Sequence, residues 1–176
     1  EHLAASGVDP AKYKLNYVYV TGLESEEKIG LLLQANLKEL GFEVEMQPEP
    51  WARMVELASK ADTAPHFMAV FHTAKYPSPD GHTYLMFHPN AWGTYMSCSF
   101  YENPEVSSLL EQARGTVDTD KRYELYGKVQ EIVADEAAAL FIANPLHRMA
   151  HRDRVTGYTF LGVLGYDLTW YPLRVK

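Results

Sequence analysis

The sequence predicts an α/β fold in which a mixed β-sheet is flanked by helices. Segments rich in β-branched and aromatic residues alternate with amphipathic helical segments along the first half of the chain. This alternation indicates strands that pair at least partly in parallel, because helical crossovers join parallel strands. A length of 176 residues is enough for one well-packed domain.

The first half of the chain carries three predicted strands and two predicted helices. Residues 14–21 are rich in tyrosine and valine, which favours a strand. Residues 24–40 have leucines at helical spacing, acidic residues in the first turn and a glycine after the last turn. Residues 42–46 alternate apolar and acidic side chains, which is typical of a half-buried strand. A shorter helical pattern at 51–60 and an apolar run of strand length at 66–72 follow.

The opening residues resemble the end of a helix. Residues 1–7 have the pattern of a last helical turn closed by a glycine cap at Gly7. A helix end without its beginning suggests a piece cut from a longer chain. We therefore expect part of any binding site to lie outside this sequence.

Two helices with clear N-terminal signals lie in the second half. Asn103 is a good N-cap and is followed by Pro104 at the first helical position, and this helix is expected to end near Gly115. Asp118 caps the next helix, which is predicted over 119–136. The remaining predicted elements are two strands, at 139–143 and 155–161.

Composition excludes several classes of function. Acidic residues number 23 against 16 basic ones, and a net charge of -7 disfavours a general binder of nucleic acid or of anionic membranes. No apolar run approaches the roughly 18 residues that a membrane-spanning helix needs. The single cysteine, Cys98, excludes an internal disulfide and a cysteine-built zinc site, and a small packed residue is the expected role.

The histidines do not form a recognisable metal site. His147 and His151 are four residues apart, as in a zinc-binding helix, but Arg148 stands where the catalytic glutamate would be. Pro145 also argues against a long helix there, so two solvated histidines are expected. The others are too widely spaced for a ligand pattern: His66, His72, His82 and His88. The prediction is therefore no metal and no cofactor.

No pattern for covalent catalysis or phosphate binding is present. The sequence contains no Gly-x-Ser-x-Gly elbow, no Gly-Lys-Ser/Thr phosphate loop and no dinucleotide fingerprint. No residue is therefore assigned a catalytic role.

The aromatic-rich segment at 73–101 is the strongest functional signal. It combines five proline and glycine residues with many aromatic and histidine side chains, and it follows the predicted strand at 66–72. Ligands of α/β proteins gather beyond the carboxyl ends of strands. Tyrosine and tryptophan offer a flat apolar face and one hydrogen-bonding group, which suits sugars, peptides and other amphipathic solutes. The alternative is that these rings only pack the loop onto the helices.

Several short segments occur in an informative order. They are the helix-to-strand segment 33–44 leading into Trp51, the Tyr-Pro-Ser-Pro loop at 76–79, Tyr-Glu-Asn-Pro-Glu-Val at 101–106, the helix 118–130 and Val-Thr-Gly-Tyr at 155–158. Each segment is a weak signal alone, but together they cover most of the chain. In this order they resemble the C-terminal lobe of bacterial extracellular solute-binding proteins of family 5.

The resemblance implies a lobe of a type II periplasmic binding protein, not an enzyme. Residues 1–176 would form the second, C-terminal lobe, with the tail at about 162–176 returning toward the missing first lobe of the same chain. Such a protein closes over a small-molecule or peptide solute and delivers it to the permease subunits of an ABC transporter. The implied location is periplasmic or extracellular, with a lipid anchor left open, and the implied partners include no nucleic acid.

Site residues carry over from the family only in part. In peptide-binding members, an aspartate just before the Tyr-Pro loop holds the amino terminus of the peptide, and the matching position here is Lys75. The positive charge of a lysine repels the ammonium group of a peptide. We therefore expect this protein not to bind a free peptide amino terminus in the way that those members do. Lys75 either meets a carboxylate, phosphate or sugar hydroxyl, or points to solvent. The full predicted ligand-binding set is His72, Lys75, Tyr76, Trp92 and Tyr95.

Two other classes of function remain open at the level of the sequence. One is a small α/β enzyme domain with its active site in the loop at 75–101. The other is an interaction domain that docks another protein on the aromatic segment. Within the binding-protein interpretation the solute is open among peptides, oligosaccharides, acidic compounds and metal chelates.

Overall fold

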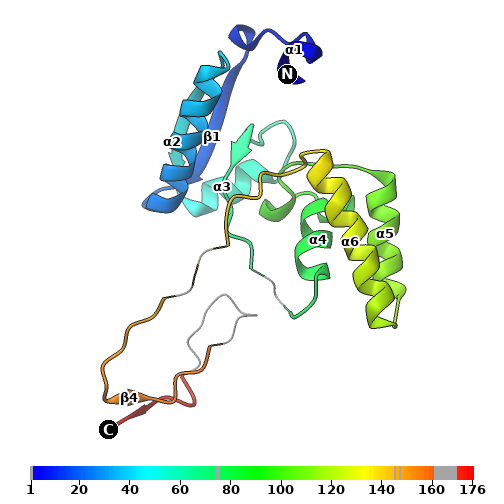
Figure 1. Ribbon diagram of the computed structural model, residues 1–176. Coiled ribbons are helices and arrows are strands. Elements are labelled where there is room, and N and C mark those ends of the chain that lie inside the picture. Colours follow the sequence, from blue (N-terminus) through cyan, green and yellow to red (C-terminus); the bar gives the residue numbers. More distant parts are fainter. Residues whose placement is uncertain (1, 74–75, 145, 147, 161–169) are drawn as a thin grey trace. The chain divides into compact units, whose positions relative to one another are not determined.

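The computed structural model describes residues 2–73, 76–144, 146, 148–160 and 170–176 (Figure 1). Instead of the single packed domain expected from the length, the chain divides into two compact units. Unit 1 takes residues up to 71 together with 89–100, and unit 2 takes 72–88 together with the residues from 101 onward. Each unit has its own hydrophobic cluster.

Unit 1 contains a three-stranded parallel sheet in the order β2-β1-β3. The strands are β1 (Lys14–Val20), β2 (Glu43–Glu49) and β3 (Phe67–Met68). Helix α2 (Glu24–Glu39) connects β1 to β2, and α3 (Trp51–Ala58) connects β2 to β3. The predicted α/β alternation and the parallel pairing are therefore confirmed, and Figure 1 shows α2 running along β1.

The central strand is buried because helices cover both of its faces. Tyr17, Val18 and Tyr19 are consecutive and all buried, although successive strand residues point to opposite faces. Tyr17 and Tyr19 cluster with the apolar side of α2, which includes Ile29, Leu33 and Leu37. Helix α3 also contacts β1, and it contributes the fully buried Met54 and Ala58.

Hydrogen bonds tie the start of α2 to β1. The Tyr17 hydroxyl donates to the backbone oxygen of Glu26 at 2.7 Å. The Glu26 carboxylate in turn accepts from the backbone N–H of Val20 at 2.8 Å. Burial raises the pKa of both side chains, and the Val20 N–H partly opposes the rise for Glu26. The first turn of α2 is therefore fixed to β1 by one buried and one partly buried hydrogen bond.

Short helices complete unit 1. Helix α1 (His2–Ser6) is closed by Gly7 with φ of 69°, as the glycine cap predicted. Three 3-10 turns follow along the chain: η1 (Pro10–Lys12), η2 (Pro89–Ala91) and η3 (Tyr95–Ser97).

Unit 2 is built mainly from three helices. They are α4 (Asp80–Phe87), α5 (Pro104–Gly115) and α6 (Thr119–Asp135), and α5 and α6 lie side by side (Figure 1). Their shared core consists of Phe87, Val106, Leu110, Ala113, Tyr126, Val129 and Val133. Strands β4 (Val155–Thr156) and β5 (Arg174–Val175) pair in antiparallel fashion.

The predicted N-caps are confirmed. The Asn103 side-chain oxygen accepts from the backbone N–H groups of Glu105 and Val106, at 2.9 and 3.2 Å. Its amide also donates to Glu136 at 2.9 Å, which links the start of α5 to the end of α6. The Asp118 carboxylate accepts from the backbone N–H of Lys121 at 3.1 Å. Both caps satisfy helix donors that would otherwise lack partners.

Three predicted strands are wrong in extent or in kind. The strand at 66–72 is reduced to Phe67–Met68, because only these residues pair with β1. The apolar run at 139–143 forms no strand, and Leu140, Phe141 and Ile142 are exposed. The strand at 155–161 is reduced to Val155–Thr156, with Leu161 outside the described residues. An apolar run becomes a strand only where a neighbouring strand is available to pair with it.

The segment at 73–101 contains a helix that the sequence analysis missed. Helix α4 begins directly after Pro79, which restricts the backbone at that point but leaves the following residues free to form a helix. Proline and glycine on both sides of the helix favoured a loop in the sequence. Phe87 at its end is buried in the core of unit 2, so tertiary packing stabilises this short helix.

Two glycine substitutions test how the helices pack. A Cβ at Gly30 would collide with the Tyr17 ring and with Met46, whereas a Cβ at Gly127 in α6 meets open space. We expect Gly30→Ala to lower the free energy of unfolding by about 1–3 kcal/mol, because the buried ring must shift. We expect Gly127→Ala to raise it by up to about 1 kcal/mol through helix propensity. Urea unfolding followed by circular dichroism measures both. Equal effects of the two variants would contradict the packing of α2 against β1.

Candidate ligand-binding site

The carboxyl edge of the unit 1 sheet carries an aromatic pair. The β1–β2 pairing extends beyond the strands through the Thr21 N–H, which donates to the Glu49 backbone oxygen at 2.9 Å. Helix α3 begins at once with Trp51, so this ring lies at the carboxyl end of β2. Tyr95 packs edge-on against Trp51, with ring centroids 4.8 Å apart. Trp51 remains 45% exposed, so part of its ring is available to a ligand.

The segment that carries Tyr95 lies alongside helix α3. Gly93 lies beside the backbone oxygen of Ser59, at the C-terminal end of α3, while Tyr95 contacts Trp51 at the other end. Trp92 is 39% exposed and its ring lies 5.9 Å from that of Phe100. The predicted site residues Trp92 and Tyr95 therefore both belong to unit 1 and both present partly exposed rings.

In unit 2, a buried carboxylate organises the start of α4. Asp80 is only 7% exposed, and its Oδ1 accepts from Arg114 Nε of α5 at 2.9 Å while its Oδ2 accepts from Arg114 Nη2 at 3.3 Å. The hydroxyl of Tyr126 on α6 donates to Oδ1 at 3.4 Å. The hydroxyl of Tyr76 donates to Oδ2. One side chain thus links three helices to the Tyr-Pro loop.

The guanidinium of Arg114 is held on its other side by an aromatic stack. It lies 3.6 Å above the ring of Tyr84, and Tyr84 stacks on His88 with centroids 4.2 Å apart. His88 Nε2 in turn lies 3.5 Å from a carboxylate oxygen of Glu111. The Tyr84 ring therefore covers one face of the Arg114 guanidinium, and the ion pair with Asp80 engages one of its edges.

These contacts define what Tyr76 can offer a ligand. Burial and the hydrogen bond to Asp80 raise the pKa of the Tyr76 hydroxyl, so it stays protonated and donates inward. Tyr76 is 40% exposed overall. We infer that any contact with a solute uses its ring and not its hydroxyl.

His72 lies against His82, which is in the first turn of α4. Their Nδ1 atoms are 2.6 Å apart and both side chains are partly buried. Burial lowers the pKa of His82, which favours its neutral form near neutral pH. This partner of His72 was missed, because the sequence analysis placed His72 at the end of a predicted strand and His82 in the loop that follows, and their separation of ten positions fits no ligand motif.

The predicted site residues do not form one cluster within either unit. His72 and Tyr76 belong to unit 2, Trp92 and Tyr95 belong to unit 1, and Lys75 lies outside the described residues. Sequence reasoning missed Asp80 and His82 as partners, and it used Trp51 only as a family marker. The position of Trp51 directly after a predicted strand was the signal that could have identified it.

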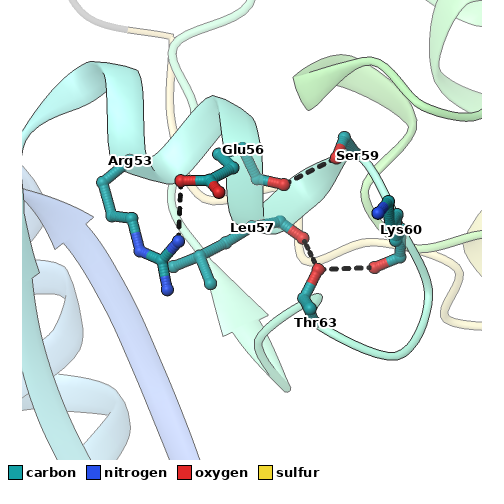
Figure 2. Close-up of a pocket in the computed structure, with 6 residues that line it drawn as sticks. All are labelled: Arg53, Glu56, Leu57, Ser59, Lys60 and Thr63. Atoms are coloured by element: carbon teal, nitrogen blue, oxygen red, sulfur yellow. Dashed lines mark hydrogen bonds and ion pairs between the residues drawn. The ribbon is translucent and has the colours of Figure 1, made fainter.

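Two hollows in the described part of the surface lie at α3 and at α6. One, of about 140 Å³, lies at the end of α3 (Figure 2) and is lined by Arg53, Glu56, Leu57, Ser59, Lys60 and Thr63. Its polar side chains bind within the site: Arg53 pairs with Glu56 at 2.6 Å, and the hydroxyls of Ser59 and Thr63 donate to backbone oxygens. The other hollow lies along the C-terminal part of α6 and is lined by residues of that helix: Glu131, Ile132, Ala134 and Asp135.

Other sequence predictions about chemistry have these outcomes. Among the described residues, no group of three or more histidine, cysteine, aspartate or glutamate side chains is arranged to hold a metal. His147 lies outside the described residues, and His151 is exposed. Cys98 is half-buried, and burial raises the pKa of its thiol, which fits a packed residue. In the part of the chain that the structure describes, no helix has the length and apolar character of a membrane span.

Comparison with known proteins finds two similar curated proteins. The chain is 31% identical over 152 residues to the probable D,D-dipeptide-binding periplasmic protein DdpA of Escherichia coli, which is 83% of this chain and 28% of that protein. It is 22% identical over 153 residues to the oligopeptide-binding protein AppA of Bacillus subtilis, covering 86% of this chain and 27% of AppA. No family model matches the chain.

A solved structure supports the same fold. The periplasmic binding protein DppA of Helicobacter pylori, in complex with the peptide STSA, superposes with a TM-score of 0.84 at 22% identity, over 98% of this chain and 33% of DppA. The chain thus has the fold of part of a periplasmic binding protein. Its relatives are the family 5 peptide-binding periplasmic proteins, so the resemblance drawn from the sequence motifs is confirmed. The chain spans less than a third of the length of the curated relatives it matches.

Removing the charge of Asp80 should destabilise unit 2. We expect Asp80→Asn to lower the free energy of unfolding by about 2 kcal/mol, because Arg114 loses its counter-charge while its partial exposure lets water compensate in part. Tyr76→Phe removes one hydrogen bond to Asp80 and should cost about 1 kcal/mol. Urea unfolding measures both effects. The exposed Tyr123 provides a control, and a loss in Tyr123→Phe equal to that in Tyr76→Phe would contradict the role of Asp80.

Proposed function

We propose that this chain is part of the solute-binding component of an ABC importer, which captures a peptide-like or other small solute between two lobes and delivers it to the permease. The observation that carries the proposal is the 31% identity to DdpA, a probable D,D-dipeptide-binding protein, over most of this chain. The peptide complex of DppA, whose fold this chain shares, supports a peptide-like solute. A periplasmic or extracellular location follows from the same relatives.

The aromatic pair at the carboxyl edge of the unit 1 sheet supports a binding role. Trp51 and Tyr95 combine flat apolar faces with partial exposure, and they stand where α/β proteins place their ligands. Each ring is held by the other, so little conformational entropy is lost when a solute stacks on them. The first lobe of the full protein would close over this edge by a hinge movement.

The enzyme alternative has no support among the relatives. The proteins that the chain matches are named as binding proteins, and the segment proposed for an active site is occupied by α4 and by short turns. Asp80, the buried carboxylate of that segment, is engaged by Arg114 and two tyrosines. A carboxylate held in this way serves structure better than proton transfer.

The aromatic pair can be tested in the full-length protein. A panel of oligopeptides, oligosaccharides and acidic metabolites is first screened by thermal shift, since a ligand at a hundred times its Kd adds roughly 2.7 kcal/mol to stability. Trp51→Ala should then weaken binding of the best solute by about twofold to tenfold, because one ring contact is lost. Isothermal titration calorimetry measures the change.

Trp170 provides the matched control, because it is also an exposed tryptophan and lies in unit 2. We expect Trp170→Ala to leave affinity unchanged. An unaltered affinity in Trp51→Ala, or the same loss in both variants, would contradict a solute site at the carboxyl edge of unit 1.

Lys75 gives a test of the solute's charge. Because a lysine replaces the aspartate of peptide-binding members, the natural protein should not prefer a peptide with a free amino terminus over the same peptide acetylated. Lys75→Asp should shift the preference toward the free amine by about fivefold or more, through attraction worth about 1 kcal/mol. Calorimetry with the two peptides measures this ratio, and Lys128→Asp on α6 is the control. A natural preference for the free amine that Lys75→Asp does not increase would contradict the proposal.

A further inference from the structure

Two histidine nitrogens in unit 2 face each other at close range. The Nδ1 atoms of His72 and His82 are 2.6 Å apart, while the ring centroids are 4.7 Å apart. The two nitrogens therefore lie on the facing edges of the two rings. His82 is fixed by the first turn of α4, and His72 approaches it from the segment before that helix.

Each neutral imidazole carries one N–H and one lone pair, so the two Nδ1 atoms can form a hydrogen bond in which one ring donates to the other. Two unprotonated Nδ1 atoms would instead direct both lone pairs toward the space between the rings. In that state a metal ion can take the place of the proton. Neutral imidazole is a preferred ligand of zinc, nickel and copper.

We propose that His72 and His82 form a two-imidazole site for a divalent transition-metal ion such as Zn²⁺, Ni²⁺ or Cu²⁺. Metal–nitrogen distances of about 2.0–2.1 Å in a tetrahedral site require the two nitrogens to be roughly 3.3 Å apart. Each ring therefore needs to withdraw by only a few tenths of an ångström. Partial burial of both side chains limits competition from water and keeps the rings close together.

The chemistry of the surroundings is compatible with this site. Both side chains of the pair are partly buried. The carboxylate of Asp80, two residues earlier in α4, is already bound by Arg114 and by two tyrosines. Among the described residues no third histidine, cysteine or carboxylate completes the set. The remaining coordination positions are therefore taken by water or by donor atoms of a bound molecule.

Titration with a metal salt alone tests the site without any solute. Isothermal titration calorimetry of the full-length protein with NiCl2, at pH 7.5 in a buffer that does not bind metal, should show one binding event per chain. His72→Ala and His82→Ala should each weaken it about tenfold or more, because each removes one of two protein ligands. His151→Ala removes an exposed histidine outside the pair and should leave the affinity unchanged.

A spectroscopic measurement separates direct ligation from a structural effect. The electron paramagnetic resonance spectrum of the Cu²⁺-loaded protein should show coupling to two imidazole nitrogens, and to one in either single variant. Circular dichroism of the metal-free variants verifies that they fold. Absence of metal binding in the natural protein, or binding that survives in the folded His72→Ala and His82→Ala variants, would overturn the proposal and leave a shared proton as the role of the pair. Because no solute is present, the result does not depend on the proposed transport function.

Discussion

The parallel pairing of β1 with β2 runs without interruption from Lys14 opposite Glu43 to Val20 opposite Glu49. This register brings the carboxyl ends of both strands to one edge of the sheet, and it requires a helical crossover, α2, to return the chain to the start of β2. Since α3 begins directly after β2, the register also fixes where Trp51 lies. Tyr95 then reaches that edge by packing on Trp51. The aromatic surface of unit 1 thus depends on the backbone pairing of β1 with β2.

Unit 2 depends on a different constraint, the burial of a single charge. A carboxylate can be nearly buried only when its charge and lone pairs are satisfied, and Asp80 draws its partners from α5, from α6 and from the Tyr-Pro loop. The helices around it are held by apolar packing, but the ion pair sets how α4 meets them. This arrangement also positions Tyr76 and His82. The Tyr76 hydroxyl donates to Asp80, and His82 follows Asp80 in the first turn of the same helix, α4.

Both constraints are consistent with the proposed binding role. Exposed faces of rings that are held by other rings suit the stacking of an amphipathic solute, and the main buried carboxylate is fully occupied by internal partners. The relatives, which bind peptides by their names, agree with this division of roles. In the facing histidines of unit 2, the two Nδ1 atoms lie 2.6 Å apart, so one ring donates a hydrogen bond to the other or the pair holds the proposed metal ion.

Local sequence signals determined the helices α2, α5 and α6, the caps Asn103 and Asp118, and the strand β1, because periodicity and capping act within a few residues. The family resemblance and the aromatic candidates Trp92 and Tyr95 also came from the sequence. Tertiary structure decided the rest. Whether 66–72 and 139–143 became strands depended on a neighbouring strand, and α4 depended on the core that receives Phe87. The partners of His72 and Tyr76 were decided in the same way, since side-chain contacts at a carboxylate or an imidazole arise from packing that no short pattern encodes.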